Sequence, residues 1–433
     1  MGADRTDFSV FGTRDYRRSR GAYHMECAFE YFVTLLVTDS FLAMLLTQLG
    51  LPESLTGVLS SLVSLAFLFE LLSVLVVERI GNTKRFVIIF HFIGQLFFVG
   101  LYLLPLLGLS ERYRGWITVA CILLAYFGRY FVTAILFKWA NSYVDPRKRG
   151  VYSSVKEMIS LLSGAAVTVA AGYVMGRFEA SGNVRGWFLL GAAAIFVFSL
   201  CDLICLLCIR NQVRTPEECA EAVPLGTVLR NVMGNRAFLN TVVLSALWQV
   251  ASYTTVGFLG TYKNALFSAA TVQIINAGAS LVRFGLSRPL GRYADTHSYA
   301  RGVRLALVIA ACAFGINMFT APGTRWLMAV YAVLYAVSIA GIEQNLINIS
   351  YSYVDSRYFV QATAIKSSIG GLCGFGASVL AGRLLSAIQA NGNMLFGIPV
   401  YGQQALSAIS FLLVIVAILF CRFVVEKQQV MLQ

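Results

Sequence analysis

Apolar runs long enough to cross a membrane recur along almost the whole chain. As α-helices, runs of about twenty residues cover the roughly 30 Å of hydrocarbon in a lipid bilayer. Charged residues make up only 13% of the sequence, whereas soluble globular domains average about 25%. The sequence therefore predicts an all-α membrane protein with many spanning helices.

The apolar runs fall into two groups on either side of a polar segment at 210–236. The predicted spans are 21–48, 54–77, 86–107, 116–141, 150–176, 186–209, 237–260, 267–290, 302–321, 326–351, 358–388 and 402–424. This gives a tail (1–20), a six-helix bundle (21–209), a linker (210–236), a second six-helix bundle (237–424) and a C-terminal tail (425–433). We therefore expect twelve transmembrane helices.

The basic residues predict how the chain lies in the membrane. Over the tails and loops, 22 lie on the side of the N-terminal tail and six on the opposite side. Because basic loops remain in the cytoplasm, this bias predicts cytoplasmic termini and a location in the cytoplasmic or plasma membrane. The same distribution accounts for the net charge of +13, so no nucleic-acid partner is expected.

One stretch of sequence occurs twice, once in each half. Residues 142–164 and 352–374 align without a gap and share nine identities in 23 positions, beginning with Ser-Tyr-Val-Asp. In this alignment Lys156 matches Lys366, and Gly164 matches Gly374. Repeats of this kind are typical of transporters built from two related bundles. The two lysines are predicted to lie at equal depth on opposite sides of one cavity.

The loops after spans 2 and 8 carry parts of a known motif. In the major facilitator superfamily these loops read Gly-x-Leu-Ala-Asp-Arg-x-Gly-Arg-Lys or Arg. Glu78, Arg79 and Gly81 match the Asp, Arg and second Gly, while Gly291 and Asp295 match the first Gly and the Asp. With its two halves and its repeat, the chain resembles this superfamily over nearly its whole length.

The resemblance implies a fold of two pseudo-symmetric six-helix bundles that rock about a central site. Spans 1, 4, 7 and 10 would line the cavity, and spans 2, 5, 8 and 11 would form the seam between the halves. Glycines on spans 5 and 11 fit this role, because they permit close helix approach: Gly164, Gly172, Gly176, Gly370, Gly371, Gly374 and Gly376. A cytoplasmic ionic gate is implied at Glu78, Arg79, Arg292, Asp295, Asp145, Arg149, Asp355 and Arg357.

The motifs of soluble enzymes are missing from the sequence. The three histidines, His24, His91 and His297, have no metal-ligand spacing. No G-x-x-x-x-G-K loop for ATP is present, and eight of the nine cysteines lie in apolar runs, where they act as small hydrophobic residues. We therefore expect no catalytic activity, no metal and no cofactor, and we expect an ion gradient or the substrate's own gradient to supply the energy.

Ionisable residues inside the spans are the candidates for coupling. Burying such a group costs roughly 2.5–3.5 kcal/mol or more, so each needs a partner or water. The candidate proton-coupling carboxylates are Glu26, Glu30, Asp39 and Glu343. Depth along the helices places Glu30 towards Arg129, and Glu343 level with Lys366. A carboxylate between an apolar environment and a cation can titrate near neutral pH, and the alternative for each group is a static ion pair.

Cations, amides and aromatic rings in the spans are the candidates for substrate binding. They are Arg129, Lys138, Lys156, Lys366, Trp248, Gln249, Tyr253, Gln344, Asn345 and Asn348. Amides bond hydroxyl groups and rings cover the apolar face of a sugar, so this set favours a small hydroxylated solute. The alternatives are ion pairs of the lysines with Glu157 or Glu343, and hydrogen bonds between helices.

The sequence thus predicts a monomeric secondary transporter that works by alternating access. A proton is the expected coupling ion, and a sugar-like solute is the preferred substrate. Two alternatives remain open. The first is proton-driven efflux of amphipathic drugs, which needs a mainly apolar cavity with one acidic residue. The second is a membrane-embedded enzyme or lipid scramblase.

Overall fold

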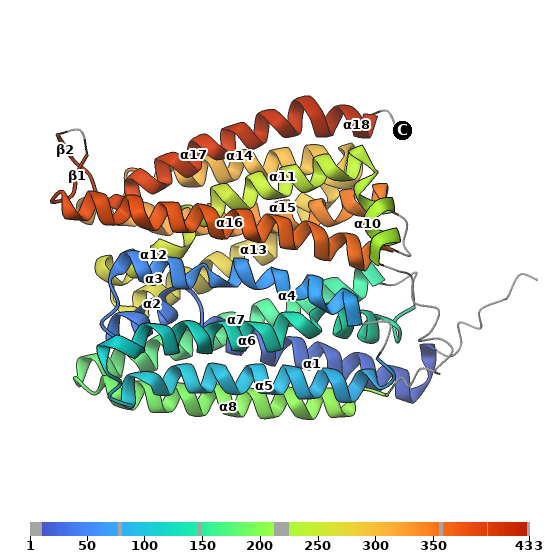
Figure 1. Ribbon diagram of the computed structural model, residues 1–433, viewed down its shortest axis with the longest axis horizontal. Helices are drawn as coiled ribbons and strands as arrows, with labels where there is room; N and C mark the ends of the chain where they lie inside the picture. Colours follow the sequence, from blue (N-terminus) through green and yellow to red (C-terminus); the bar gives the residue numbers. More distant parts are fainter. Residues whose placement is uncertain are drawn as a thin grey trace, which may run out of the picture.

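A bundle of long helices forms the molecule, and the helices run side by side along one axis (Figure 1). The computed structural model describes residues 11–76, 80–145, 149–211, 225–354, 358–395 and 397–430. A short β-hairpin marks one end of the bundle, here called the hairpin end. Helices α10 (Leu225–Met233) and α18 (Glu426–Val430) lie at the other end, called the terminus end (Figure 1).

The first half of the chain supplies the lower helices of Figure 1. They are α1 (Arg14–Leu36), α2 (Asp39–Gln48), α3 (Glu53–Ser60), α4 (Leu62–Val76), α5 (Thr83–Leu103), η3 (Leu104–Leu106), α6 (Glu111–Asn141), α7 (Arg149–Ala180) and α8 (Val184–Cys208). Lys84 fixes the end of α8, because its Nζ donates to the carbonyl oxygens of Leu207 and Ile209 at 2.6 and 2.9 Å. A cation at the last carbonyls of a helix also complements the helix dipole.

The second half repeats this arrangement. Its elements are α10 (Leu225–Met233), α11 (Arg236–Tyr253), α12 (Val256–Leu266), α13 (Ala269–His297), α14 (Tyr299–Asn317), η5 (Pro322–Thr324), α15 (Trp326–Tyr353), α16 (Phe359–Ala390), β1 (Met394–Leu395), β2 (Ile398–Pro399), α17 (Gly402–Phe420), a π-helical turn (Cys421–Val425) and α18 (Glu426–Val430). Helix α10 and the β-hairpin were not predicted from the sequence.

Among the described residues, ten helical segments are long and apolar enough to span a membrane. An eleventh is added if α1 and α2, which meet at 43°, form one bent span. The predicted span 267–290 falls on α13, which is 29 residues long and carries Arg283, Arg288 and Arg292. Helix α13 is not among the segments counted above. The predicted all-α membrane fold is confirmed, although the expected twelve spans exceed this count of up to eleven by one.

The first predicted span is broken rather than continuous. The break falls at Val37 and Thr38, and Asp39 begins α2 with a φ of 49°. Two threonine hydroxyls bond back to the preceding turn, Thr34 to Glu30 O and Thr38 to Thr34 O, both at 2.8 Å. Such bonds bend helices, and Asp is among the few residues that tolerate positive φ. The break directs Asp39 towards the second half.

The two halves meet along two seams. Helix α4 packs along α16, and α7 packs along α13, as the resemblance implied for spans 2, 11, 5 and 8. A Cβ atom added at Gly371 would lie 2.1 Å from Ser64 O, and one at Gly172 would lie 2.5 Å from Gln273 Cβ. The close approach predicted for these glycines is therefore confirmed, whereas Gly376 has no neighbour within 4 Å of an added Cβ.

Candidate functional site

Glu343 is a candidate carboxylate on which charged groups of both halves act. It lies within α15, and its side chain is exposed. The charged groups that act on it are Arg283, Glu157 and Lys366, which belong to α13, α7 and α16. Because α7 comes from the first half and α15 from the second, Glu343 faces both halves. A carboxylate in this position is accessible to water and to a small solute.

Lys366 lies on α16 and is 6% exposed. The carboxylates that act on its charge are Glu70 of α4 and Glu343 of α15. Among the described residues neither forms an ion pair with Lys366 within 4.0 Å, so the pair with Glu343 suggested by depth is not formed in this conformation. A buried ammonium group between two carboxylates at longer range remains able to bind an anionic or hydroxylated ligand.

Lys156, the repeat partner of Lys366, has different surroundings. Its Nζ lies 5.6 Å from the centre of the Tyr23 ring, and its side chain is half-buried. The next residue, Glu157, pairs across the seam with Arg283 of α13 at 3.4 Å. The two lysines therefore occupy matching sequence positions on α7 and α16 but have different neighbours.

Glu30 and Arg129 form an ion pair inside the first half. The Arg129 Nε atom lies 2.7 Å from Glu30 Oε1, and Arg129 Nη1 donates to Thr34 Oγ1 at 2.6 Å. The guanidinium group also lies 5.9 Å from the ring centre of Tyr130. The proximity expected from helix depth is thus present in the structure. Lys138 is exposed near the end of the same helix, α6.

Asp39 joins the halves near the hairpin end. Lys263 Nζ of α12 lies 2.7 Å from Asp39 Oδ2, and Asn276 Nδ2 of α13 donates to the same oxygen at 2.9 Å. Lys263 Nζ also donates to Asn276 Oδ1 at 3.3 Å. We call these three residues the Asp39 gate. The sequence predicted a loop at Lys263, but α12 continues to Leu266, and the residue is only 8% exposed.

Glu53 makes a second set of contacts between the halves at the hairpin end. It begins α3, and it accepts hydrogen bonds from Thr261 Oγ1 at 2.9 Å and from Gln389 Nε2 at 2.5 Å. Gln403 Nε2 also donates to Glu53 Oε1. All three donors belong to the second half. Together with the Asp39 gate, these contacts hold the halves closed at this end.

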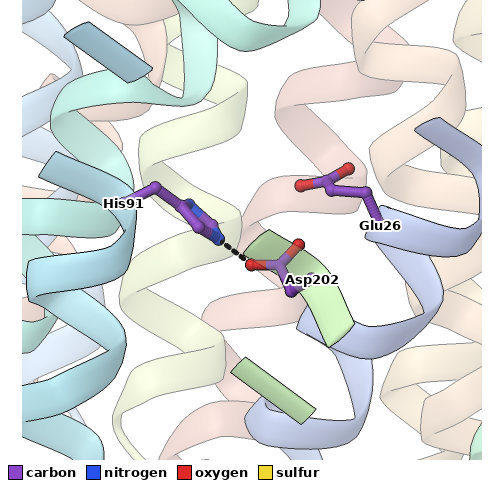
Figure 2. A group of neighbouring side chains, drawn as sticks. All are labelled: Glu26, His91 and Asp202. Carbon is purple, nitrogen blue, oxygen red and sulfur yellow. Dashed lines mark hydrogen bonds and ion pairs between the residues drawn. The ribbon is translucent and has the colours of Figure 1, made fainter. Parts of the chain in front are cut away.

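A buried group of three side chains lies entirely within the first half. Glu26 of α1, His91 of α5 and Asp202 of α8 are 0%, 2% and 1% exposed. His91 Nε2 lies 2.7 Å from Asp202 Oδ2, and Figure 2 shows the Glu26 carboxylate directed towards these two residues. One ligand atom from each residue lies within 4.8 Å of the others, so the three residues, here named the Glu26 cluster, are able to hold a metal ion.

Only Glu26 of this cluster was a candidate in the sequence. The spacing of the histidines gave no indication of a metal site, because the three ligands come from different helices. Asp202 was overlooked altogether. The available signal was a lone aspartate in the apolar run 186–209, since a carboxylate at that depth requires a partner.

The neutral candidates have mixed positions. Trp248 is buried and stacks on Tyr335, with ring centres 6.1 Å apart. Asn345 is buried and donates to Gly341 O at 2.7 Å, which is the packing role left open by the sequence. Gln344 is exposed, and the remaining three candidates are half-buried: Gln249, Tyr253 and Asn348.

The expected ionic gate at the terminus end is described only in part. Arg292 and Asp295 are exposed on α13. Asp145 is half-buried and precedes α7, which begins at Arg149. Four members lie outside the described residues: Glu78, Arg79, Asp355 and Arg357.

Comparisons with known proteins give the same fold. The family model described as Major Facilitator Superfamily matches residues 27–378. A mutant of the nucleoside transporter NupG superposes with a TM-score of 0.71 at 11% identity, over 93% of this chain and 99% of that chain. A bacterial homologue of the human lysosomal transporter Spinster, in an inward-facing and unoccupied conformation, gives 0.65 at 17% identity over 97% of both chains.

A third similar structure is a POT family transporter in complex with 5-aminolevulinic acid. Its TM-score is 0.64 at 12% identity, and the match covers 94% of this chain and 96% of that chain. A search of curated protein sequences found no match. At these identities the structural likeness establishes the shared fold.

Proposed function

The chain belongs to the major facilitator superfamily, and from this premise we propose that it is a proton-coupled secondary transporter of a small polar organic solute. Alternating access would carry the solute past the space between the halves. The observation that supports this proposal best is Glu343, an exposed carboxylate whose charged neighbours come from both halves. A sugar-like solute remains the preferred substrate.

The charges around this space favour a polar solute over an apolar drug. Three charged residues act on Glu343, namely Arg283, Glu157 and Lys366. Glu70 acts in turn on Lys366. An amphipathic drug bound among these charged side chains would displace their water without offering them hydrogen-bond partners. A solute with hydroxyl, amine or carboxylate groups would instead bond them. Among the structurally similar proteins, one is named as a nucleoside transporter and one holds 5-aminolevulinic acid.

Proton coupling would use the carboxylates that lie close to a cation. In this proposal Glu343 binds a proton together with the solute, and Glu30 leaves its ion pair with Arg129 to take up a proton from water as the bundle changes conformation. The conformation described has the hairpin end held closed by Asp39 and Glu53. The solute and proton would therefore enter and leave the present conformation at the terminus end, which the bias of the basic residues predicts to face the cytoplasm.

The test begins with the purified full-length protein. Sugars, nucleosides, organic anions, amino acids and amphipathic drugs would be screened for an increase in the midpoint of thermal unfolding, because a ligand that binds only the folded state stabilises it. Uptake of each stabilising compound into proteoliposomes would then be measured with and without a proton gradient. We expect a polar solute to be transported and the gradient to accelerate its transport.

Two variants test the site itself. Glu343→Gln should abolish the response to the proton gradient, and Lys366→Met should lower uptake about tenfold or more because it removes a buried cation. Glu179→Gln provides the matched control, since Glu179 is an exposed carboxylate of α7 at the hairpin end. Gradient-independent transport by both wild-type and Glu343→Gln protein would exclude proton coupling. Stabilisation by drugs alone would favour the efflux alternative.

A further inference from the structure

We propose that the Glu26 cluster is a binding site for a divalent transition-metal ion of the zinc class. The proposal does not depend on the transported substrate, because the cluster lies within the first half and not between the halves. Its three side chains are at most 2% exposed, so the ion would be a resident part of the fold rather than cargo. The argument rests on the donor set, on unpartnered oxygens and on charge.

The donor set suits such an ion. One imidazole nitrogen and two carboxylates are ligands that Zn²⁺ commonly takes, whereas Ca²⁺ and Mg²⁺ prefer oxygen alone. The ligands come from α1, α5 and α8, and their nearest atoms lie within 4.8 Å of one another. Tetrahedral zinc with bonds of about 2.0–2.1 Å has ligand atoms about 3.3 Å apart. Side-chain rotations that move each ligand atom by about 1 Å are therefore enough to form the site.

Two carboxylate oxygens of the cluster lack donors. Among the described residues, Glu26 Oε1 and Asp202 Oδ1 are buried without a hydrogen-bond partner, and so is Oε1 of the adjacent Gln95. All three are acceptors, and each side chain is at most 3% exposed. Buried acceptors without donors are costly. A bound cation would satisfy the two carboxylate oxygens at once.

A bound cation would also balance the two carboxylates of the cluster. Two carboxylates lie beside one imidazole, and among the described residues no lysine or arginine pairs with Glu26 or Asp202. The nearby Arg129 is already bonded to Glu30 and Thr34. Metal binding would displace the proton from His91 Nε2 and lengthen its 2.7 Å contact with Asp202.

Two side chains are positioned to complete the coordination. Cys27 Sγ lies 3.2 Å from Glu26 Oε2, and the Gln95 amide nitrogen lies 3.2 Å from His91 Nε2. A thiolate from Cys27 would give a tetrahedral site with mixed donors. An amide oxygen would serve after rotation of the Gln95 amide group, because its oxygen and nitrogen are interchangeable by a half-turn. A spectrum of the cobalt form distinguishes the two.

The test is the metal content of the full-length protein purified in detergent. After zinc loading and removal of free metal, elemental analysis should find about one zinc per wild-type chain. His91→Ala and Asp202→Asn should each lose it. Glu30→Gln is the matched control, because Glu30 lies one turn from Glu26 on α1 but pairs with Arg129, and it should retain zinc. Because His91→Ala could fail to fold, His91→Cys, which supplies another zinc ligand, should restore binding.

Spectroscopy and stability provide independent measurements. Cobalt in place of zinc should give the visible absorption of a four-coordinate site. A thiolate charge-transfer band that disappears in Cys27→Ser would identify Cys27 as the fourth ligand, and its absence would favour Gln95. Chelation should lower the midpoint of thermal unfolding, and zinc should restore it. Wild-type protein that takes up no zinc at saturating concentration, with an unchanged unfolding midpoint, would overturn the proposal and identify the cluster as a proton-sharing acid group.

Discussion

The Glu26 cluster and the Asp39 gate are each built around a carboxylate of the same bent span, and they are built in opposite ways. Asp39 is compensated by a lysine and an amide that both come from the other half. Glu26 meets another carboxylate and an imidazole, all from its own half. Asp39 is also more accessible, since its side chain is 32% exposed whereas Glu26 is fully buried.

The difference follows from what each group must do when the halves move. Contacts across the halves have to break and re-form, so their charges need water within reach in the open state. Contacts within one half persist through the cycle and tolerate complete burial. On this one span, the break between α1 and α2 separates Glu26, whose contacts stay within one half, from Asp39, whose contacts cross to the other half. We therefore expect cluster variants to change stability and gate variants to change conformation.

The largest effect should come from His91→Leu, which leaves Asp202 buried without its partner. Breaking a buried ion pair costs about 3–5 kcal/mol, and each kcal/mol lowers the unfolding midpoint by a few degrees in a chain of this size. Differential scanning fluorimetry should therefore show a fall of about 5 °C or more. The distance between spin labels at Leu107 and Phe319, which are exposed at the hairpin end, should stay unchanged.

Those labels require a background in which the nine native cysteines are replaced. Arg304→Gln is the control for losing one charge, because it removes a partly exposed pair with Glu426 at the terminus end. A fall in stability as small as that of the control would mean that the cluster is not a buried ion pair. Widening of the hairpin end in His91→Leu would break the proposed division between stability and conformation.

The sequence predicted the features that depend on one helix at a time. Hydropathy gave the spanning segments, the repeat gave the two halves, and depth along spans 1 and 4 brought Glu30 to Arg129. These properties follow from a rise of about 1.5 Å per residue and from the thickness of a bilayer. Glycine positions on spans 5 and 11 likewise indicated the seams, where Gly371 meets Ser64.

The features that depend on rotation about the helix axis were not predictable. Depth placed Glu343 level with Lys366, yet Arg283 and Glu157 also act on Glu343, and Glu70 also acts on Lys366. Asp202 and His91 lie on separate apolar runs, and only the packing of α5 against α8 brings them together. The local bend at Thr38 also moved Asp39 from a presumed cavity position to the gate.

A second prediction concerns the seam rather than the charges. Gly371→Ala places a methyl carbon 2.1 Å from Ser64 O and 2.8 Å from a Phe67 ring carbon. Forcing α16 away from α4 should cost about 1–3 kcal/mol and lower transport tenfold to a hundredfold in proteoliposomes. Gly376→Ala, five residues along the same helix, has no neighbour within 4 Å and should transport normally. Equal activity of the two variants would show that this seam does not need its close approach.

The third prediction tests the Asp39 gate directly. Lys263→Met leaves Asp39 without its cation and with hydrogen bonds from Asn276 and Ser40 alone among the described residues, so the closed hairpin end should lose about 1–2 kcal/mol relative to the open one. In the Leu107–Phe319 distance distribution, the ratio of the wide to the narrow population should rise roughly tenfold. Asp39→Asn combined with Lys263→Met removes the uncompensated charge and should recover part of the closed population. No recovery in the double variant would mean that Lys263 acts through packing and not through charge.

The smallest effect is expected at Glu53, because three donors share that carboxylate. Gln389→Met removes the 2.5 Å bond and leaves those from Thr261 and Gln403 in place. The loss of one hydrogen bond to a charged group costs about 1.5 kcal/mol or less when others remain. The label distances should therefore broaden only slightly, and Gln48→Met, an exposed glutamine at the same end, should leave them unchanged. A larger opening than in Lys263→Met would make Glu53, rather than Asp39, the main contact that closes this end.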